Sequence, residues 1–128
     1  MANLSSNIVL SFQHSIKTKR YTIDEKLNEK GKCNEIVKDL FKKFQDISNS
    51  TWQELQNKPK KSGYETIPIS NFKISLDIIK ESLNLSDDSK IIVFRFHRQD
   101  YRILGVQKNN ILYIIGYDWD FSSYNHGN

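Results

Sequence analysis

The chain has 128 residues and a net charge of +4, from 19 lysines and arginines against 15 aspartates and glutamates. This length predicts one domain, residues 1–128, and the 12% aromatic content with only two prolines excludes disordered and collagen-like classes. Cys33 is the only cysteine, which excludes an internal disulfide and a zinc site built from several cysteines.

The first half of the chain predicts a strand followed by a long helix. Residues 7–13, NIVLSFQ, are apolar and β-branched, as in a short strand, and residues 21–23 are typical of a second one. From residue 33 to residue 48, apolar side chains recur along one helical stripe, with lysines and aspartates on the opposite side. We therefore expect an amphipathic helix over residues 33–48.

The middle of the chain predicts two short helices separated by an extended segment. Thr51 and Glu54 have the spacing of a capping box, so a helix is expected to start near Thr51. Residues 64–70 are expected to be extended, because Pro68 disfavours a helix and is tolerated at a sheet edge. The apolar spacing then predicts a further helix over residues 75–83.

The last third of the chain predicts three strands joined by tight turns. The strands are expected over residues 91–98, 101–106 and 110–118, which together form an antiparallel meander. A strand, then helices, then three consecutive strands predict an α+β fold in which the helices pack on one face of one sheet.

Alternation along the predicted strands separates two faces of the sheet. Ile92, Phe94 and Phe96 share the face expected under the helices, whereas Arg95 and His97 share the other face. We expect this second face to turn Arg95, His97 and several tyrosines toward solvent or a ligand. The sequence leaves the strand register open, and so also whether Arg102 joins them.

The sequence predicts a cytoplasmic protein that does not contact membranes. Residues 1–15 have no basic leading segment, and their only apolar run covers residues 8–10. No other stretch approaches the ~20 apolar residues that cross a bilayer.

Positive charge is concentrated in the first half, in the segments KTKR (17–20) and KPKK (58–61). A pI of 9.1 is compatible with nucleic acid as a partner, because lysines that approach phosphates release counterions. A solvated, lysine-rich surface explains the same charge without any ligand, and the charge alone favours that explanation.

The segment after the last predicted strand, DWDFSSYNH (118–126), gathers polar and aromatic side chains. Asp118, Asp120 and His126 would form a metal site, and hence a metal-dependent hydrolase, if they converged. Carboxylates that follow a strand more often cap turns or pair with lysines, so we expect no metal and no other cofactor. Trp119 and Phe121 are expected to close the end of the sheet as apolar side chains.

Residues 101–124, YRILGVQKNNILYIIGYDWDFSSY, resemble the C-terminal strand pair of the RelE/ParE toxin superfamily. The shared features are a Tyr-Arg strand, a short turn with asparagine, an apolar strand and a polar segment that ends in tyrosine. The match lies mainly over residues 90–126. It implies a single RelE-like domain with an N-terminal strand, two to three helices and a three-stranded antiparallel meander, in which residues 64–83 are an insertion.

The resemblance also implies a function within a toxin–antitoxin pair. RelE-like toxins act on RNA at the ribosome, as endoribonucleases or inhibitors of translation, and are held inactive by a cognate antitoxin protein. Transferred to this chain, a metal-independent catalytic set comprises Arg102, Tyr124, His126 and His97. The corresponding nucleic-acid contacts comprise Lys58, Lys60, Lys61, Arg95 and Arg98.

One departure from the superfamily pattern favours an alternative. Where RelE-like toxins carry a basic segment, this chain has Asp118-Trp119-Asp120, and two carboxylates beside a scissile phosphate would repel it unless a metal intervened. The alternative is a non-catalytic interaction protein on the same fold, such as a mobile-element-encoded inhibitor that binds a host protein or nucleic acid.

Overall fold

The computed structural model describes residues 5–27 and 33–125. The strands are β1 (Val9–Ser11), β2 (Glu65–Pro68), β3 (Lys90–Phe96), β4 (Tyr101–Lys108) and β5 (Ile111–Asp118). The helices are α1 (Asp24–Leu27), α2 (Cys33–Ser48), α3 (Trp52–Gln56) and α4 (Asp77–Ser82), with 3-10 helices at Lys19–Tyr21 and Ile69–Asn71. None of the helices in these described segments is both long and apolar enough to cross a bilayer.

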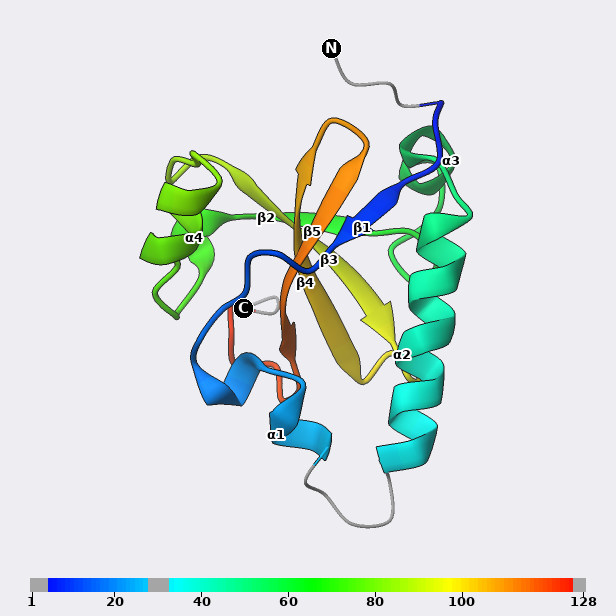
Figure 1. The fold of residues 1–128 in the computed structure, drawn as a ribbon, viewed down its shortest axis with the longest axis horizontal. Helices are drawn as coiled ribbons and strands as arrows, with labels where there is room; N and C mark the ends of the chain where they lie inside the picture. The colour runs from blue at the N-terminus through cyan, green and yellow to red at the C-terminus, as the bar shows by residue number, and fades with distance from the viewer. Residues whose placement is uncertain (1–4, 28–32, 126–128) are drawn as a thin grey trace.

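The strands form one five-stranded mixed sheet in the order β1-β5-β4-β3-β2 (Figure 1). β1 runs parallel to β5, and the other neighbouring strands are antiparallel. The predicted α+β class is confirmed. The three-stranded meander accounts only for β3, β4 and β5, because β2 adds a further edge strand and β1 pairs in parallel.

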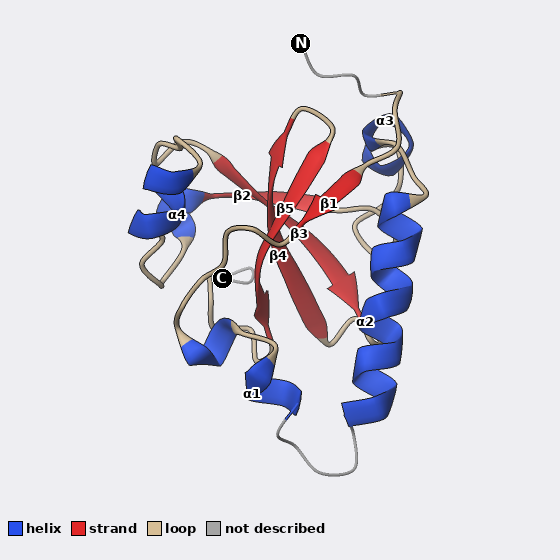
Figure 2. Cartoon of the chain, in the orientation of Figure 1, coloured by secondary structure: helices blue, strands red, loops and turns tan. Residues whose placement is uncertain are grey.

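Helix α2 packs along one side of the sheet, and α4 lies on the opposite side (Figure 2). The predicted helix over residues 33–48 is confirmed as α2, which buries Ile36, Leu40 and Ile47 and leaves Val37 and Phe41 exposed. The α2 face of the sheet supplies Phe94 and Phe96, and α3 adds Trp52. The side chains buried in this layer are Ile8, Ile36, Leu40, Ile47, Trp52, Leu55, Ile92, Phe94, Phe96, Ile103, Leu112, Ile114 and Trp119.

The capping box at the start of α3 is also confirmed. The Glu54 backbone N–H donates to Thr51 Oγ1 at 3.1 Å, and the Thr51 N–H donates to Glu54 Oε1 at 3.0 Å. Two backbone donors that the helix itself cannot satisfy thereby find partners.

The opposite face of the sheet, which we call the arginine face because it carries Arg95 and Arg102, is covered over only part of its length. Ile79 and Leu83 from the α4 region pack on Val93 of β3, together with other buried apolar side chains. The strands contribute Ile91, Leu104, Val106 and Ile115 to this layer, and the segments that cover them add Ile16, Tyr21, Ile69, Leu76 and Tyr124. The strand predicted over residues 21–23 is not present, because Tyr21 ends a 3-10 helix and packs into this layer.

A bulge in the β4–β5 pairing changes which face the end of β5 presents. Leu104 pairs with Gly116 and Gly105 pairs with Ile114, so Ile115 is the extra residue between them. Strict alternation along β5 would place Asp118 on the α2 face. The bulge instead places Asp118 opposite Arg102, on the arginine face.

Candidate anion-binding pocket

A polar pocket of about 440 Å³ opens on the uncovered part of the arginine face. It is lined by Lys60, Glu65, Ile67, Arg95, Arg102, Phe121, Tyr124 and Asn125. Three of these described side chains are cations and one is a carboxylate, so the pocket carries an excess of positive charge. Its lining comes from β2, β3 and β4 and from the segment after β5, which are brought together by the strand order of the sheet.

Arg95 and Arg102 lie directly opposite each other on β3 and β4. Arg102 is almost fully buried, at 7% exposure, and the Arg95 side chain is 23% exposed. The Nε atom of each is buried without a hydrogen-bond partner among the described residues. Like charges placed opposite each other across a strand pair destabilise a sheet, and so does a buried donor without a partner. A bound anion would offset the repulsion between the two opposed charges.

The contacts that hold the two arginines leave donor capacity directed at the pocket. Arg102 Nη1 donates to the carbonyl oxygen of Gln99 at 2.7 Å and to that of Tyr101 at 3.2 Å. Arg95 Nη2 lies 3.8 Å from Glu65 Oε1, which is a loose ion pair. A guanidinium carries five N–H donors in a planar fork, and this geometry matches phosphate.

Glu65 is the carboxylate of the pocket, and the sequence analysis did not identify it. Its Oε2 lies 3.5 Å from Lys60 Nζ, and its Oε1 accepts a hydrogen bond from the Tyr124 hydroxyl at 3.4 Å. Glu65 pairs with Val93, and this register turns its side chain onto the arginine face. The signal for it was the predicted extended segment over residues 64–70, once that segment is paired with β3.

Tyr124 is buried at 2% exposure and packs against Phe72, with ring centres 5.2 Å apart. Burial raises the pKa of Tyr124 to about 12, and the nearby Glu65 carboxylate adds to the rise. The phenol therefore keeps its proton at neutral pH and can donate a hydrogen bond or a proton. Tyr124 and Arg102 line the same pocket.

Asp118 organises the segment that carries Phe121 and Tyr124. Its Oδ1 accepts from the backbone N–H of Asp120 and of Ser122, each at 3.2 Å, and its Oδ2 accepts from the Ser123 N–H at 3.1 Å and from the Ser123 hydroxyl. Burial alone would raise the pKa of Asp118, but these hydrogen bonds hold it below its ordinary value. The buried carboxylate thus holds the backbone of residues 120–123 in place.

Asp120 and Trp119 make their contacts outside the polar pocket. Asp120 Oδ2 pairs with Arg20 at 2.5 Å on the surface. The Trp119 indole N–H donates to the Thr22 carbonyl oxygen at 2.8 Å, and its ring packs against Phe96 on the α2 face. Neither aspartate lines the pocket, although the Asp118 charge contributes to the raised pKa of Tyr124.

Within residues 5–27 and 33–125, no three His, Cys, Asp or Glu side chains lie together as a metal-binding group. His126, which was expected in the catalytic set and in the alternative metal site, lies outside the described residues.

His97 and Arg98 are not among the residues that line the pocket. β3 ends at Phe96, and residues 97–99 all have positive φ angles, so strand alternation stops there. His97 Nδ1 lies 2.7 Å from Asp39 Oδ2 of α2, and its ring stacks on Tyr101. Arg98 Nη2 lies 3.3 Å from His97 Nε2. These contacts tie the β3–β4 turn to α2.

The lysines of KPKK are divided between two sites. Lys60 lines the polar pocket, whereas Lys58 and Lys61 line a second hollow of about 450 Å³ with Lys43 of α2. Burial lowers the pKa of Lys43, and nearby Lys58 lowers it further, although Asp46 acts in the opposite direction. Contact of Lys58 and Lys61 with nucleic acid therefore stays a prediction that does not depend on the pocket.

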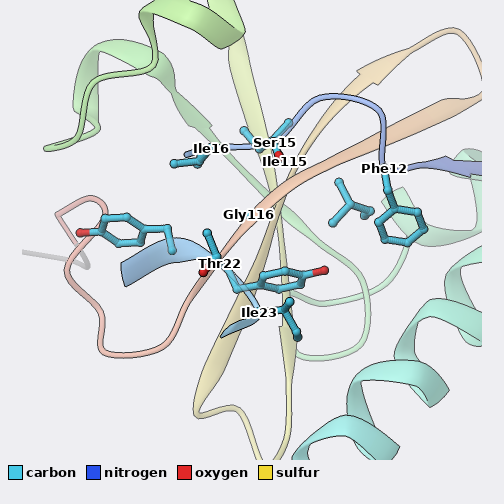
Figure 3. A pocket seen from close by; sticks show the side chains of 10 residues that line it. Phe12, Ser15, Ile16, Thr22, Ile23, Ile115 and Gly116 are labelled. Carbon is cyan, nitrogen blue, oxygen red and sulfur yellow. The ribbon is translucent and has the colours of Figure 1, made fainter. Parts of the chain in front are cut away.

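A separate apolar pocket of about 200 Å³ lies beside β5 (Figure 3). Ser15 and Ile16 lie on one side of it, Thr22 and Ile23 on the other, and Gly116 between them. A Cβ atom at Gly116 would lie 3.0 Å from Ile16 Cδ1, so the chains approach closely at its floor. The volume is below the ~300–1,000 Å³ of ordinary small-molecule sites, and we assign no ligand to it.

The chain has no significant match among protein-family models, curated proteins or solved structures. Its function is therefore argued from the geometry of the polar pocket.

Proposed function

We propose that the chain acts on RNA as a RelE-like toxin, either an endoribonuclease or an inhibitor of translation, within a toxin–antitoxin pair. The observation that carries the proposal is the opposed pair Arg95 and Arg102, whose side chains both line a polar pocket. Two guanidinium groups at this spacing suit a phosphodiester, which spreads its negative charge over several oxygens.

The remaining pocket groups fit cleavage by the neighbouring ribose. In this reaction the 2′-hydroxyl oxygen attacks phosphorus, its proton passes to the Glu65 carboxylate, and the bond to the 5′ oxygen breaks. Tyr124, whose pKa of about 12 keeps it protonated, donates its proton to that leaving oxygen. Arg95 and Arg102 stabilise the charge that develops on the phosphate, so the step needs no metal. The products are a cyclic phosphate and a 5′-hydroxyl end.

A protein partner is the second part of the proposal. Val37 and Phe41 of α2 are exposed large apolar side chains, and exposed Phe12 packs beside Phe44 at a ring-centre distance of 5.4 Å. This surface lies on α2 and near β1, away from the polar pocket. It supports a contact with an antitoxin, and it equally supports the alternative of a non-catalytic interaction protein.

The test combines growth arrest with cleavage of ribosome-bound mRNA. We expect induced expression of the chain to arrest a bacterial host, and Arg102→Ala to slow cleavage about 100-fold, which is the usual effect of removing one charge-stabilising group. Tyr124→Phe keeps the ring and its packing on Phe72, so a loss of rate would come from the hydroxyl. Lys90→Ala is the matched control, because Lys90 is an exposed cation on β3 outside the pocket.

If the unmodified chain neither arrests growth nor cleaves RNA, the catalytic proposal is wrong and the interaction protein takes its place. If cleavage occurs but Arg102→Ala and Lys90→Ala behave alike, the pocket is not the active site.

A further inference from the structure

Phe121 combines two features that are unfavourable for a phenylalanine. Its backbone is left-handed, with φ of 61°, and its side chain is 46% exposed. A left-handed φ costs free energy for any residue with a Cβ atom, and exposure forfeits the gain from burying a large apolar ring. The other described non-glycine residues with positive φ are all polar: Asn84, His97, Arg98, Gln99 and Asn109. Phe121 is therefore the one apolar side chain among the described non-glycine residues with positive φ.

The loop that carries Phe121 is fixed on both sides. The Asp118 carboxylate accepts hydrogen bonds from the backbone N–H groups of Asp120, Ser122 and Ser123, which bracket Phe121. Beyond them, the Lys73 N–H donates to the Ser123 carbonyl oxygen at 2.8 Å. The exposed ring is thus held in a defined place by buried hydrogen bonds, as a preorganised binding group requires.

The Phe121 ring lies in the lining of the polar pocket. The Arg102 guanidinium lies 5.0 Å from the centre of the Phe121 ring, within range of a cation–π interaction. A phosphate held by Arg102 therefore leaves the base attached to the same nucleotide within reach of an exposed aromatic surface. Proteins that bind single-stranded RNA place unstacked bases on aromatic rings in this way.

We propose that Phe121 is a stacking platform for one base of single-stranded RNA, while Arg95 and Arg102 hold the adjacent phosphate. This inference rests on the proposed function and deepens it, because it makes the ligand an unstacked nucleotide rather than a phosphate alone. Duplex RNA, whose bases are stacked on one another, cannot use the platform without unpairing.

The test measures binding of two strands to the full chain. One is a short single-stranded oligonucleotide with 2′-O-methyl groups throughout, which removes the attacking hydroxyl and prevents cleavage. The other has the same length and number of phosphates but lacks bases. We expect the unmodified protein to bind the base-bearing strand about tenfold or more tightly, in the range that one stacked base contributes.

Phe121→Ala should bring the affinity for the base-bearing strand down to that for the abasic strand, and leave the abasic affinity unchanged. Phe121→Trp should preserve the difference, because indole also offers a stacking surface. Phe41→Ala is the matched control, since Phe41 is a 62% exposed phenylalanine on α2, far from the pocket lining.

The outcomes separate the inference from the proposed function. Equal affinity of the unmodified protein for both strands overturns the stacking platform and leaves the RNA-directed function in place. A loss of abasic affinity in Phe121→Ala also overturns it, because the ring would then act by positioning Arg102. Failure of the unmodified protein to bind either strand overturns both the platform and the RNA-directed function.

Discussion

The two faces of the sheet use the same strands for opposite purposes. On the α2 face, Phe94, Phe96 and Trp52 are buried among apolar neighbours, and the Trp52 indole N–H is a buried donor without a partner among the described residues. On the arginine face, the same strands place Arg95 opposite Arg102 and leave donors without partners. The difference that distinguishes the faces is charge: the arginine face places two like charges opposite each other beside a polar pocket, whereas the α2 layer buries apolar side chains. The proposed binding site lies on the arginine face for this reason.

The largest expected change in the free energy of unfolding comes from a substitution on the α2 face. Phe94→Ala removes a ring with no exposed surface and leaves a cavity, so we expect the free energy of unfolding to fall by about 3–5 kcal/mol. Chemical denaturation monitored by circular dichroism measures this loss. A loss below about 1 kcal/mol would show that the α2 face is not the main source of stability.

The next effect concerns Asp118, which lies on the arginine face but serves the fold. Asp118→Asn keeps the size of the side chain and replaces a charged acceptor by an amide, so we expect a loss of about 1.5–3 kcal/mol in unfolding free energy. Pocket binding should weaken as well, because the loop of Phe121 loses its anchor.

The same residue gives a pH signature. The pKa of Asp118 is lower in the folded chain than its ordinary value of about 3.9, so its contribution is complete above that value. It is lost as the pH falls through the folded-state pKa. The Asp118→Asn variant should therefore lose less stability than the unmodified protein between about pH 4 and pH 2. Parallel acid denaturation curves for the two proteins would contradict this assignment.

A smaller change in the free energy of unfolding, opposite in sign, is expected from the arginine pair. Arg95→Met removes one of two opposed like charges and a buried unpartnered donor, so the unfolding free energy should stay the same or rise by up to about 1 kcal/mol. RNA affinity should fall in the same variant. A marked loss of stability would mean that Arg95 is a structural residue and that the two faces do not differ as we describe.

The smallest expected effect is a change in RNA affinity that distinguishes two neighbouring lysines, Lys60 and Lys61. Lys60→Gln should lower RNA affinity and reduce the slope of log affinity against log salt by about one, as expected for one lost phosphate contact. Lys61→Gln changes the same charge one residue away, outside the pocket lining. An unchanged slope for Lys60→Gln would remove Lys60 from the binding site, and a slope reduced by both variants would mean that Lys61 in the second hollow also contacts phosphate.

The sequence predicted those features that depend on local patterns. Helix α2 and the Thr51 capping box were placed correctly, because helical periodicity and helix caps depend on residues that are close together in the sequence. Alternation assigned Phe94 and Arg95 to opposite faces, because β3 is regular between its ends.

The features that the sequence missed depend on local irregularity or distant pairing. Alternation failed at His97, where three left-handed residues end the strand, and at Asp118, where the bulge at Ile115 reverses the faces. Glu65 was missed because its place follows from the pairing of β2 with β3, and Phe121 was assigned to apolar closure because its backbone angle was not visible.

The parallel pairing of β1 with β5 has a consequence for how the molecule is made. Val9 pairs with Ile111, and Thr22 accepts a hydrogen bond from Trp119, so segments synthesised early have their partners among those synthesised late. Such distant contacts carry a large loop-closure entropy and form slowly. A nascent chain that has not yet exposed β5 and the residues after it lacks both the partner of β1 and the loop of Phe121. Pulse-labelled hydrogen exchange during refolding should show β1 amides gaining protection no earlier than those of β5.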